Sequence, residues 1–145
     1  MDAGVVLAAG DSTRMGFPKQ LAEIKDKPLL ELVIEKVNSN FQLSTVVLGY
    51  ENELIEEKIN FYNSNILINE NWEEGIVSSI RTALFFYQEQ KQIEKFTKAN
   101  INQMAKDNDN DYVYLIRIDW DLEKSIRENP NINFIKVKET NNDNN

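Results

Sequence analysis

The chain begins with the pattern of a buried strand that runs directly into a cationic loop of small residues. Residues 5–7 are Val-Val-Leu, and residues 8–10 are Ala-Ala-Gly. Apolar residues that do not alternate with polar ones are typical of a parallel strand covered on both faces. Small residues let a ligand approach the backbone, and the N–H groups of such a loop point at anions. Because Arg14 and Lys19 follow in the same loop, the sequence predicts a phosphate-binding site there.

The rest of the chain alternates between strand and helix patterns. Strands are predicted at 4–8, 44–49, 65–68, 112–118 and 132–137, and helices at about 27–38, 51–60, 76–88 and 122–128. Between 89 and 111 we expect a helical extension followed by a mobile acidic loop. This order is typical of a parallel sheet with right-handed crossovers. The predicted fold is therefore an α/β, three-layer, Rossmann-like domain with a mainly parallel sheet, which binds ligands beyond the carboxyl ends of its strands.

Composition narrows the classes of function. With 145 residues, we expect one domain over 1–140 and a disordered tail over 141–145. The net charge of −8 argues against nucleic-acid binding, which needs an excess of Lys and Arg. Without Cys or His, thiolate, imidazole and ordinary zinc chemistry are excluded, and a bound metal would be a hard cation such as Mg²⁺. No secretory signal or membrane-spanning run is evident, so a cytoplasmic protein is expected.

A second polar group of residues follows the third predicted strand. It consists of Asn69, Gly75, Ser78 and Ser79. Gly75 precedes the predicted helix 76–88, and the two serines lie in its first turn. A helix start offers free N–H groups and hydroxyls to an anion. The alternative is ordinary helix capping by the same polar residues. Trp72, in the same stretch, is interpreted as a packing residue, and the apolar face of the helix is expected to comprise Ile76, Ile80, Ala83, Leu84 and Tyr87.

The loop at 7–21, called the signature loop below, carries a family resemblance. Its pattern of Leu7, Ala8, Ala9, Gly10, Ser12, Arg14, Met15, Gly16, Lys19 and Leu21 resembles the opening loop of the nucleotidyltransferases that activate molybdenum cofactor. The cytidylyltransferase branch is the most similar, and it also carries Asn-x-x-Trp-x-x-Gly-x-x-Ser-Ser, as residues 69–79 do here. The resemblance implies a nucleotide-diphospho-sugar transferase type of fold. It covers residues 1–87 and fades beyond them, and members of the family are typically longer.

The resemblance also implies roles for individual residues. Arg14 and Lys19 would be the catalytic cations on the triphosphate, and Ser12 would bond a phosphate oxygen. The backbone from Leu7 through Ala8 and Ala9 to Gly10 would hold the nucleotide. Asn69, Gly75, Ser78 and Ser79 would line the nucleotide and acceptor side. Asp119 would bind the metal, although the family's Gly-Asp-x-Pro is replaced by Ile118-Asp119-Trp120-Asp121, and a surface acid is the alternative.

The implied activity is Mg²⁺-dependent transfer of a nucleoside monophosphate, CMP from CTP or alternatively GMP from GTP, onto a phosphorylated acceptor such as molybdopterin. Pyrophosphate would be released, and a molybdoenzyme or its chaperone would be the partner. Three alternatives stay open. They are a sugar-1-phosphate nucleotidyltransferase, a nucleotide-binding module without turnover, and a protein-interaction domain that binds no triphosphate.

Overall fold

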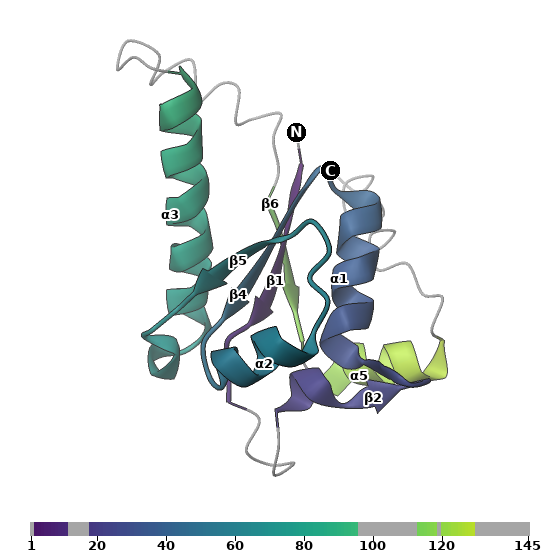
Figure 1. Cartoon of the computed structure of the whole chain (residues 1–145). Coiled ribbons are helices and arrows are strands. Elements are labelled where there is room, and N and C mark those ends of the chain that lie inside the picture. Colours follow the sequence, from purple (N-terminus) through teal and green to yellow (C-terminus); the bar gives the residue numbers. More distant parts are fainter. Residues whose placement is uncertain (1, 12–17, 96–112, 119, 130–145) are drawn as a thin grey trace.

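The computed structural model is built around a parallel sheet (Figure 1). It describes residues 2–11, 18–95, 113–118 and 120–129. The strands are β1 (Ala3–Ala8), β4 (Leu43–Leu48), β5 (Asn65–Ile68) and β6 (Val113–Arg117). Their order in space is β5-β4-β1-β6, and every pairing is parallel. The predicted alternation of strands and helices and the predicted parallel sheet are therefore confirmed over the part of the chain that the structure describes.

Helices cover both faces of this sheet (Figure 1). Because side chains alternate along a strand, β1 sends Val6 and Ala8 into one apolar cluster and Val5 and Leu7 into the other. The first cluster is completed by α1 (Leu29–Asn40), α2 (Asn52–Lys58) and α5 (Trp120–Glu128). The second is completed by α3 (Ile76–Lys95). The result is the predicted three-layer α/β arrangement. No helix in the described ranges is long and apolar enough to span a bilayer.

Helix α1 forms because its apolar residues recur at helical spacing. Five of them are fully buried, namely Leu29, Leu30, Val33, Ile34 and Val37. The start differs from the prediction, which began this helix at residue 27. Lys27–Pro28 instead forms a short strand, β3, which pairs antiparallel with β2 (Glu23–Ile24). Pro28 has an extended backbone (φ −60°, ψ 142°), and the helix begins only after it.

Helix α3 continues beyond residue 88 to Lys95, in line with the expected helical extension, but its buried face differs from the prediction. Ala83 and Tyr87 are buried against the sheet, as expected, but Ile76 and Leu84 are 38% and 41% exposed. The Tyr87 hydroxyl shares a 2.7 Å hydrogen bond with Thr45 of β4, which fixes where the helix sits. Burial raises the pKa of Tyr87 above its ordinary value of 10.0, although the hydrogen bond to Thr45 acts in the opposite direction.

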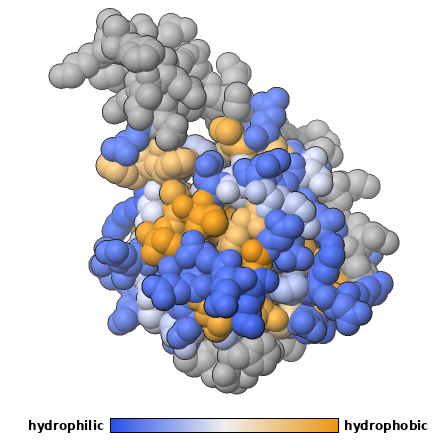
Figure 2. Space-filling view, in the orientation of Figure 1, coloured by the Kyte–Doolittle hydropathy of each residue, from blue (hydrophilic) through white to orange (hydrophobic). Residues whose placement is uncertain are grey.

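Exposed apolar side chains gather over β5 and α3 (Figure 2). They include Ile66, Ile68, Val77, Leu84 and Phe85. Strand β5 lies at one edge of the sheet, and its apolar residues are only partly covered. The predicted strand at 132–137, the acidic loop that ends at 111 and the tail at 141–145 lie outside the described residues.

Loops at the carboxyl ends of the strands are tied to one another. The Tyr50 N–H donates to the Ala9 carbonyl at 3.0 Å, and the Asn69 N–H donates to the Leu48 carbonyl at 2.7 Å. These bonds join the ends of β1, β4 and β5. The edge at which ligands bind in open α/β sheets is therefore held together by backbone hydrogen bonds.

Candidate functional site

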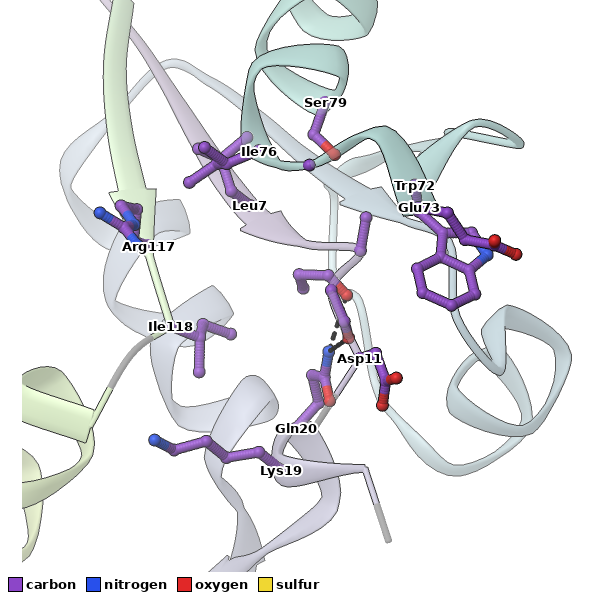
Figure 3. Close-up of a pocket in the computed structure, with 14 residues that line it drawn as sticks. Leu7, Asp11, Lys19, Gln20, Trp72, Glu73, Ile76, Ser79, Arg117 and Ile118 are labelled. Carbon is purple, nitrogen blue, oxygen red and sulfur yellow. Dashed lines mark hydrogen bonds between the residues drawn. The ribbon is translucent and has the colours of Figure 1, made fainter. Parts of the chain in front are cut away.

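A pocket of about 370 Å³ lies at this carboxyl edge (Figure 3). Four parts of the chain line it: the end of β1, the short helix η2 (Lys19–Leu21), the stretch before and into α3, and the end of β6. Of the predicted site residues, it brings together Leu7, Ala8, Ala9, Gly10, Lys19, Gly75 and Ser79. The two motifs that were predicted separately, one in the signature loop and one at 69–79, thus share one pocket.

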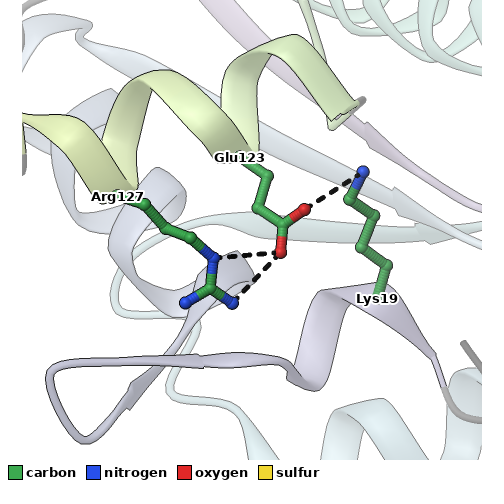
Figure 4. A network of polar contacts seen from close by, with 3 residues as sticks. All are labelled: Lys19, Glu123 and Arg127. Atoms are coloured by element: carbon green, nitrogen blue, oxygen red, sulfur yellow. Dashed lines mark hydrogen bonds and ion pairs between the residues drawn. The ribbon is translucent and has the colours of Figure 1, made fainter.

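Lys19 reaches this pocket from η2 and is held by the far end of the chain. Its side chain is only 14% exposed, and its Nζ lies 3.6 Å from Oε2 of Glu123 in α5 (Figure 4). Glu123 is buried, and its other oxygen, Oε1, accepts from Arg127 Nη2 at 3.1 Å and Nε at 3.3 Å. At 3.6 Å the Lys19–Glu123 contact is an ion pair without hydrogen-bond geometry. The lysine is thus neutralised in part while it stays on the pocket wall.

Gln20 anchors η2 to the end of β1. Its side chain is buried, and its Nε2 donates to the carbonyl of Ala8 at 2.8 Å and to that of Gly10 at 3.4 Å. Gln20 therefore joins the two sides of the signature loop and places Lys19 beside Gly10. No role was predicted for Gln20, because a single glutamine between Lys19 and Leu21 has no motif of its own.

Asn69 organises the second motif from within. It is buried, and its Nδ2 donates to Ser78 Oγ at 2.8 Å and to Ser79 Oγ at 2.9 Å. Its Oδ1 accepts from the Asn71 N–H at 3.0 Å. These bonds place Asn69 behind the pocket wall. Asn69 thus supports the local fold, while a ligand contact by these residues stays a prediction.

The two serines have different surroundings. The Ser78 hydroxyl donates within the chain, to the Gly75 carbonyl at 2.6 Å and to the Asn71 carbonyl at 3.1 Å. Ser79 lines the pocket and accepts from Asn69, and among the described residues its hydroxyl has no acceptor. Since an oxygen that already accepts can still donate its proton, Ser79 can offer that proton to a bound ligand. Ser78 is not in the pocket lining and serves the turn before α3.

Trp72 forms the wall opposite η2 and is part of the site as well as of the packing. It belongs to the short helix η3 (Trp72–Glu74), lies edge-on to Tyr50 with ring centres 5.2 Å apart, and lines the pocket. Its position depends on Gly49, because a Cβ added there would lie 2.6 Å from Trp72 Cβ. This close approach explains why a glycine stands at the end of the strand predicted over 44–49.

Four charged residues of the described chain line the pocket. Lys19 and Arg117 are cationic, and Asp11 and Glu73 are acidic. Sequence reasoning did not assign Arg117, Asp11 or Glu73 to the site, since an arginine or acid at the end of an element has no motif of its own. Three predicted residues, Ser12, Arg14 and the metal ligand Asp119, lie outside the described residues. Among the residues that the structure does describe, no cluster of three or more acids is placed to hold a metal.

The resemblance of the signature loop to nucleotidyltransferases can be tested by comparing the whole chain with known proteins. The sequence profile of the MobA-like NTP transferase domain matches residues 4–119. The chain belongs to this family. The match takes in the signature loop, the second motif and strand β6, so the resemblance that the loop predicted is confirmed at the level of the family.

Individual relatives share limited sequence identity with this chain, and they are longer than it is. Bifunctional protein GlmU of Methanococcus vannielii is 28% identical over 162 aligned positions, which cover 98% of this chain and 38% of that protein. The crystal structure of Rv0371c from Mycobacterium tuberculosis H37Rv matches with a TM-score of 0.51 and 28% identity, over 57% of this chain and 42% of that one. A homologue of Rv0371c from Mycobacterium sp. strain JC1 matches with a TM-score of 0.51 and 34% identity, over 59% and 43%. This chain therefore spans less than half the length of each of these relatives.

Proposed function

We propose that the protein is a nucleotidyltransferase that moves a nucleoside monophosphate from a triphosphate onto a phosphorylated acceptor, with release of pyrophosphate. The observation that carries this proposal is the shared pocket. The end of β1, the lysine of the signature loop and the start of α3 all line one cavity at the carboxyl edge of a parallel sheet. Membership in the MobA-like NTP transferase family supports a nucleoside triphosphate as the ligand.

The chemistry requires alignment and charge stabilisation more than proton transfer. An acceptor phosphate is already anionic and can attack the α-phosphorus, so that one P–O bond forms while the bond to the leaving pyrophosphate breaks. The protein then has to hold the two anions in line and stabilise charge on the phosphoryl oxygens. Lys19 lies in the pocket for this role, and Arg14 of the same loop is proposed to share it. Ser12 is proposed to bond a phosphate oxygen.

Backbone groups at the end of β1 are proposed to contact the nucleotide. The carbonyls of Ala8 and Gly10 already accept from Gln20, and that of Ala9 accepts from Tyr50. A nucleobase that binds at the end of β1 would therefore form hydrogen bonds with backbone N–H groups or with the second lone pairs of these carbonyls. Ser79 is proposed to donate its hydroxyl proton to the ligand from the opposite wall, while Asn69, Ser78 and Gly75 fix the geometry behind it.

A divalent cation fits the chemistry of the residues present. Mg²⁺ takes oxygen ligands, and one or two carboxylates together with substrate phosphates suffice to hold it. Asp11 and Glu73 bring carboxylates to the pocket lining, and Asp119 is proposed to supply another just beyond β6. When bound, Mg²⁺ would neutralise part of the phosphate charge.

Within this activity, we propose CTP as the donor and molybdopterin as the acceptor. Support comes from two motifs that resemble the cytidylyltransferase branch, namely Ala-Ala-Gly at 8–10 in the signature loop and Asn-x-x-Trp-x-x-Gly-x-x-Ser-Ser at 69–79. GTP as the donor and a sugar 1-phosphate as the acceptor are the competing assignments. Cytoplasmic location and transfer of the product to a molybdoenzyme or its chaperone belong to the same proposal, as does a single domain over residues 1–140.

Pyrophosphate release tests the activity. CTP and GTP are each supplied with Mg²⁺ and either molybdopterin or a sugar 1-phosphate, and pyrophosphate is measured together with the nucleotidylated product. The proposal predicts release that needs both substrates, with CTP and molybdopterin the best pair. Triphosphate binding without release under every combination would support a nucleotide-binding module instead. Absence of triphosphate binding would support a protein-interaction domain.

A further inference from the structure

Arg117 occupies a position in the pocket that the sequence motifs do not explain. It is the last residue of β6, it is paired in register with Leu7 of β1, and both line the pocket. Side-chain alternation puts Val113, Leu115 and Arg117 on the same face of β6. The strand thus presents apolar residues along its length and places an arginine only where the pocket begins.

The charges of the pocket are divided between two sides (Figure 3). Arg117 and Lys19 lie on one side of the view, with Ile118 between them, and Asp11 and Glu73 lie on the other. The start of α3 also contributes to the lining, through Gly75 and Ile76. The N-terminus of a helix carries partial positive charge. An anionic group that is not bound to a cation is therefore attracted toward the Arg117–Lys19 side and repelled by the carboxylates of the other side.

Arg117 differs from the other arginine near the site in its partners. The guanidinium of Arg127 is bonded to Glu123. By contrast, Arg117 is exposed and forms no hydrogen bond or ion pair with any other residue in the described parts of the chain. A guanidinium presents several N–H donors in a planar fork that matches phosphate oxygens. Parallel pairing to β1 fixes the backbone of Arg117 beside the pocket, where this fork is available to an anion.

We propose that Arg117 binds a phosphoryl group of the substrate and forms, with Lys19, the anion-binding side of the pocket. This inference rests on the proposed function, because it assigns a substrate contact within that same site. The phosphoryl group has two candidate sources, namely the pyrophosphate end of the triphosphate and the phosphate of the acceptor. In either case Arg117 is a binding residue that contributes charge from β6, outside the signature loop.

Calorimetric titrations of the full chain test this assignment. Mg²⁺–CTP, Mg²⁺–pyrophosphate and CMP are titrated into wild-type protein, Arg117→Gln, Arg117→Lys and Arg81→Gln. Arg81 is the matched control, because it is an exposed arginine on α3 outside the pocket lining and its replacement changes the net charge equally. Inorganic phosphate is also titrated into protein saturated with Mg²⁺–CTP, as a probe for the acceptor side.

The expected result for Arg117→Gln is a loss of phosphate affinity of about tenfold, which corresponds to about 1.4 kcal/mol. If the triphosphate is the source, CTP and pyrophosphate weaken together while CMP does not change. If the acceptor is the source, only phosphate binding to the CTP complex weakens. Arg117→Lys should recover part of the affinity in either case. Equal affinities for every ligand in Arg117→Gln and Arg81→Gln would overturn this inference alone, whereas a wild-type chain that binds no nucleotide or pyrophosphate would overturn it together with the proposed function.

Discussion

Lys19 and Glu123 form an ion pair that joins the signature loop to helix α5, with Lys19 Nζ 3.6 Å from Glu123 Oε2. Glu123 is buried, so its charge depends on Lys19 and Arg127 for compensation. A buried carboxylate with two cationic partners stabilises the fold only while both partners are present. The position of Lys19 in the pocket therefore depends on α5, a helix that is distant from it in sequence.

Replacement of Glu123 with glutamine should lower the free energy of unfolding by about 1–3 kcal/mol, because the charged hydrogen bonds from Arg127 and the attraction of Lys19 are lost. Chemical denaturation measures the change. Arg127→Gln should also destabilise, because it leaves the buried carboxylate of Glu123 without its hydrogen-bond donors. Lys124→Gln is the control, since Lys124 is an exposed residue of the same helix. Equal stability of Glu123→Gln and wild-type protein would show that the ion pair contributes nothing to the fold.

Replacing each serine of the second motif should have a different effect: one replacement should lower the stability of the fold, and the other should weaken CTP binding. Ser78→Ala removes a hydroxyl that bonds the Gly75 and Asn71 carbonyls, and a cost of about 1 kcal/mol in unfolding free energy is expected. Ser79→Ala should instead weaken CTP binding about tenfold while the midpoint of denaturation shifts less. The two variants are compared by denaturation and by titration calorimetry. If Ser78→Ala lowered CTP affinity more than Ser79→Ala did, the assignment of roles would be reversed.

Gly49 should tolerate no side chain, because a Cβ there meets Trp72 at 2.6 Å and Ala9 at 3.0 Å. Gly49→Ala is expected to cost about 1–3 kcal/mol of stability through overpacking. It should also change the fluorescence of Trp72. Gly10→Ala is the matched control, since nothing lies within 4 Å of a Cβ at that position. The prediction is wrong if the two variants unfold at the same denaturant concentration.

Tyr87 should make stability depend on alkaline pH. Burial raises its pKa in the folded state above the ordinary value of 10.0, so the folded protein holds the phenolic proton more tightly than the unfolded chain does. The associated stability is fully present below pH 10 and is lost as the pH rises through the folded-state pKa. Unfolding free energies of wild-type protein and Tyr87→Phe, measured from pH 8 upward, should converge. Parallel curves would contradict the raised pKa.

The sequence predicted the fold well where local pattern and packing agree. Strand β1 is buried on both faces and is an unbroken run of apolar and small residues, β4 ends in the buried apolar residues 46–48, and α1 carries its apolar residues at helical spacing. Lys27–Pro28 was wrongly assigned to the helix because proline suits a first helical turn as well as an extended strand. Ile76 and Leu84 were wrongly assigned to the buried face. Helical spacing shows which residues share a face of a helix, but it does not show which of them the sheet covers.

The candidate site was predictable to the extent that it lies within motifs. Lys19, Gly10 and Ser79 belong to matched patterns and do line the pocket. Glu123 and Arg117 escaped prediction for a physical reason. In the sequence, Glu123 looks like a solvated acid on a polar helix and Arg117 like a solvated arginine at the end of a strand. Only the fold places Lys19 beside Glu123 and the pocket beside Arg117.

Titration of Mg²⁺–CTP into wild-type protein and Lys19→Gln tests the central claim, that the pocket at the end of β1 holds a nucleoside triphosphate through its cations. Arg14→Ala is titrated in parallel, and Lys36→Gln serves as a control because Lys36 lies on α1 away from the pocket. CTP should bind wild-type protein and Lys36→Gln alike, and both loop variants should bind it at least about tenfold more weakly. Equal affinity in all four proteins would show that the pocket does not hold the triphosphate through these cations.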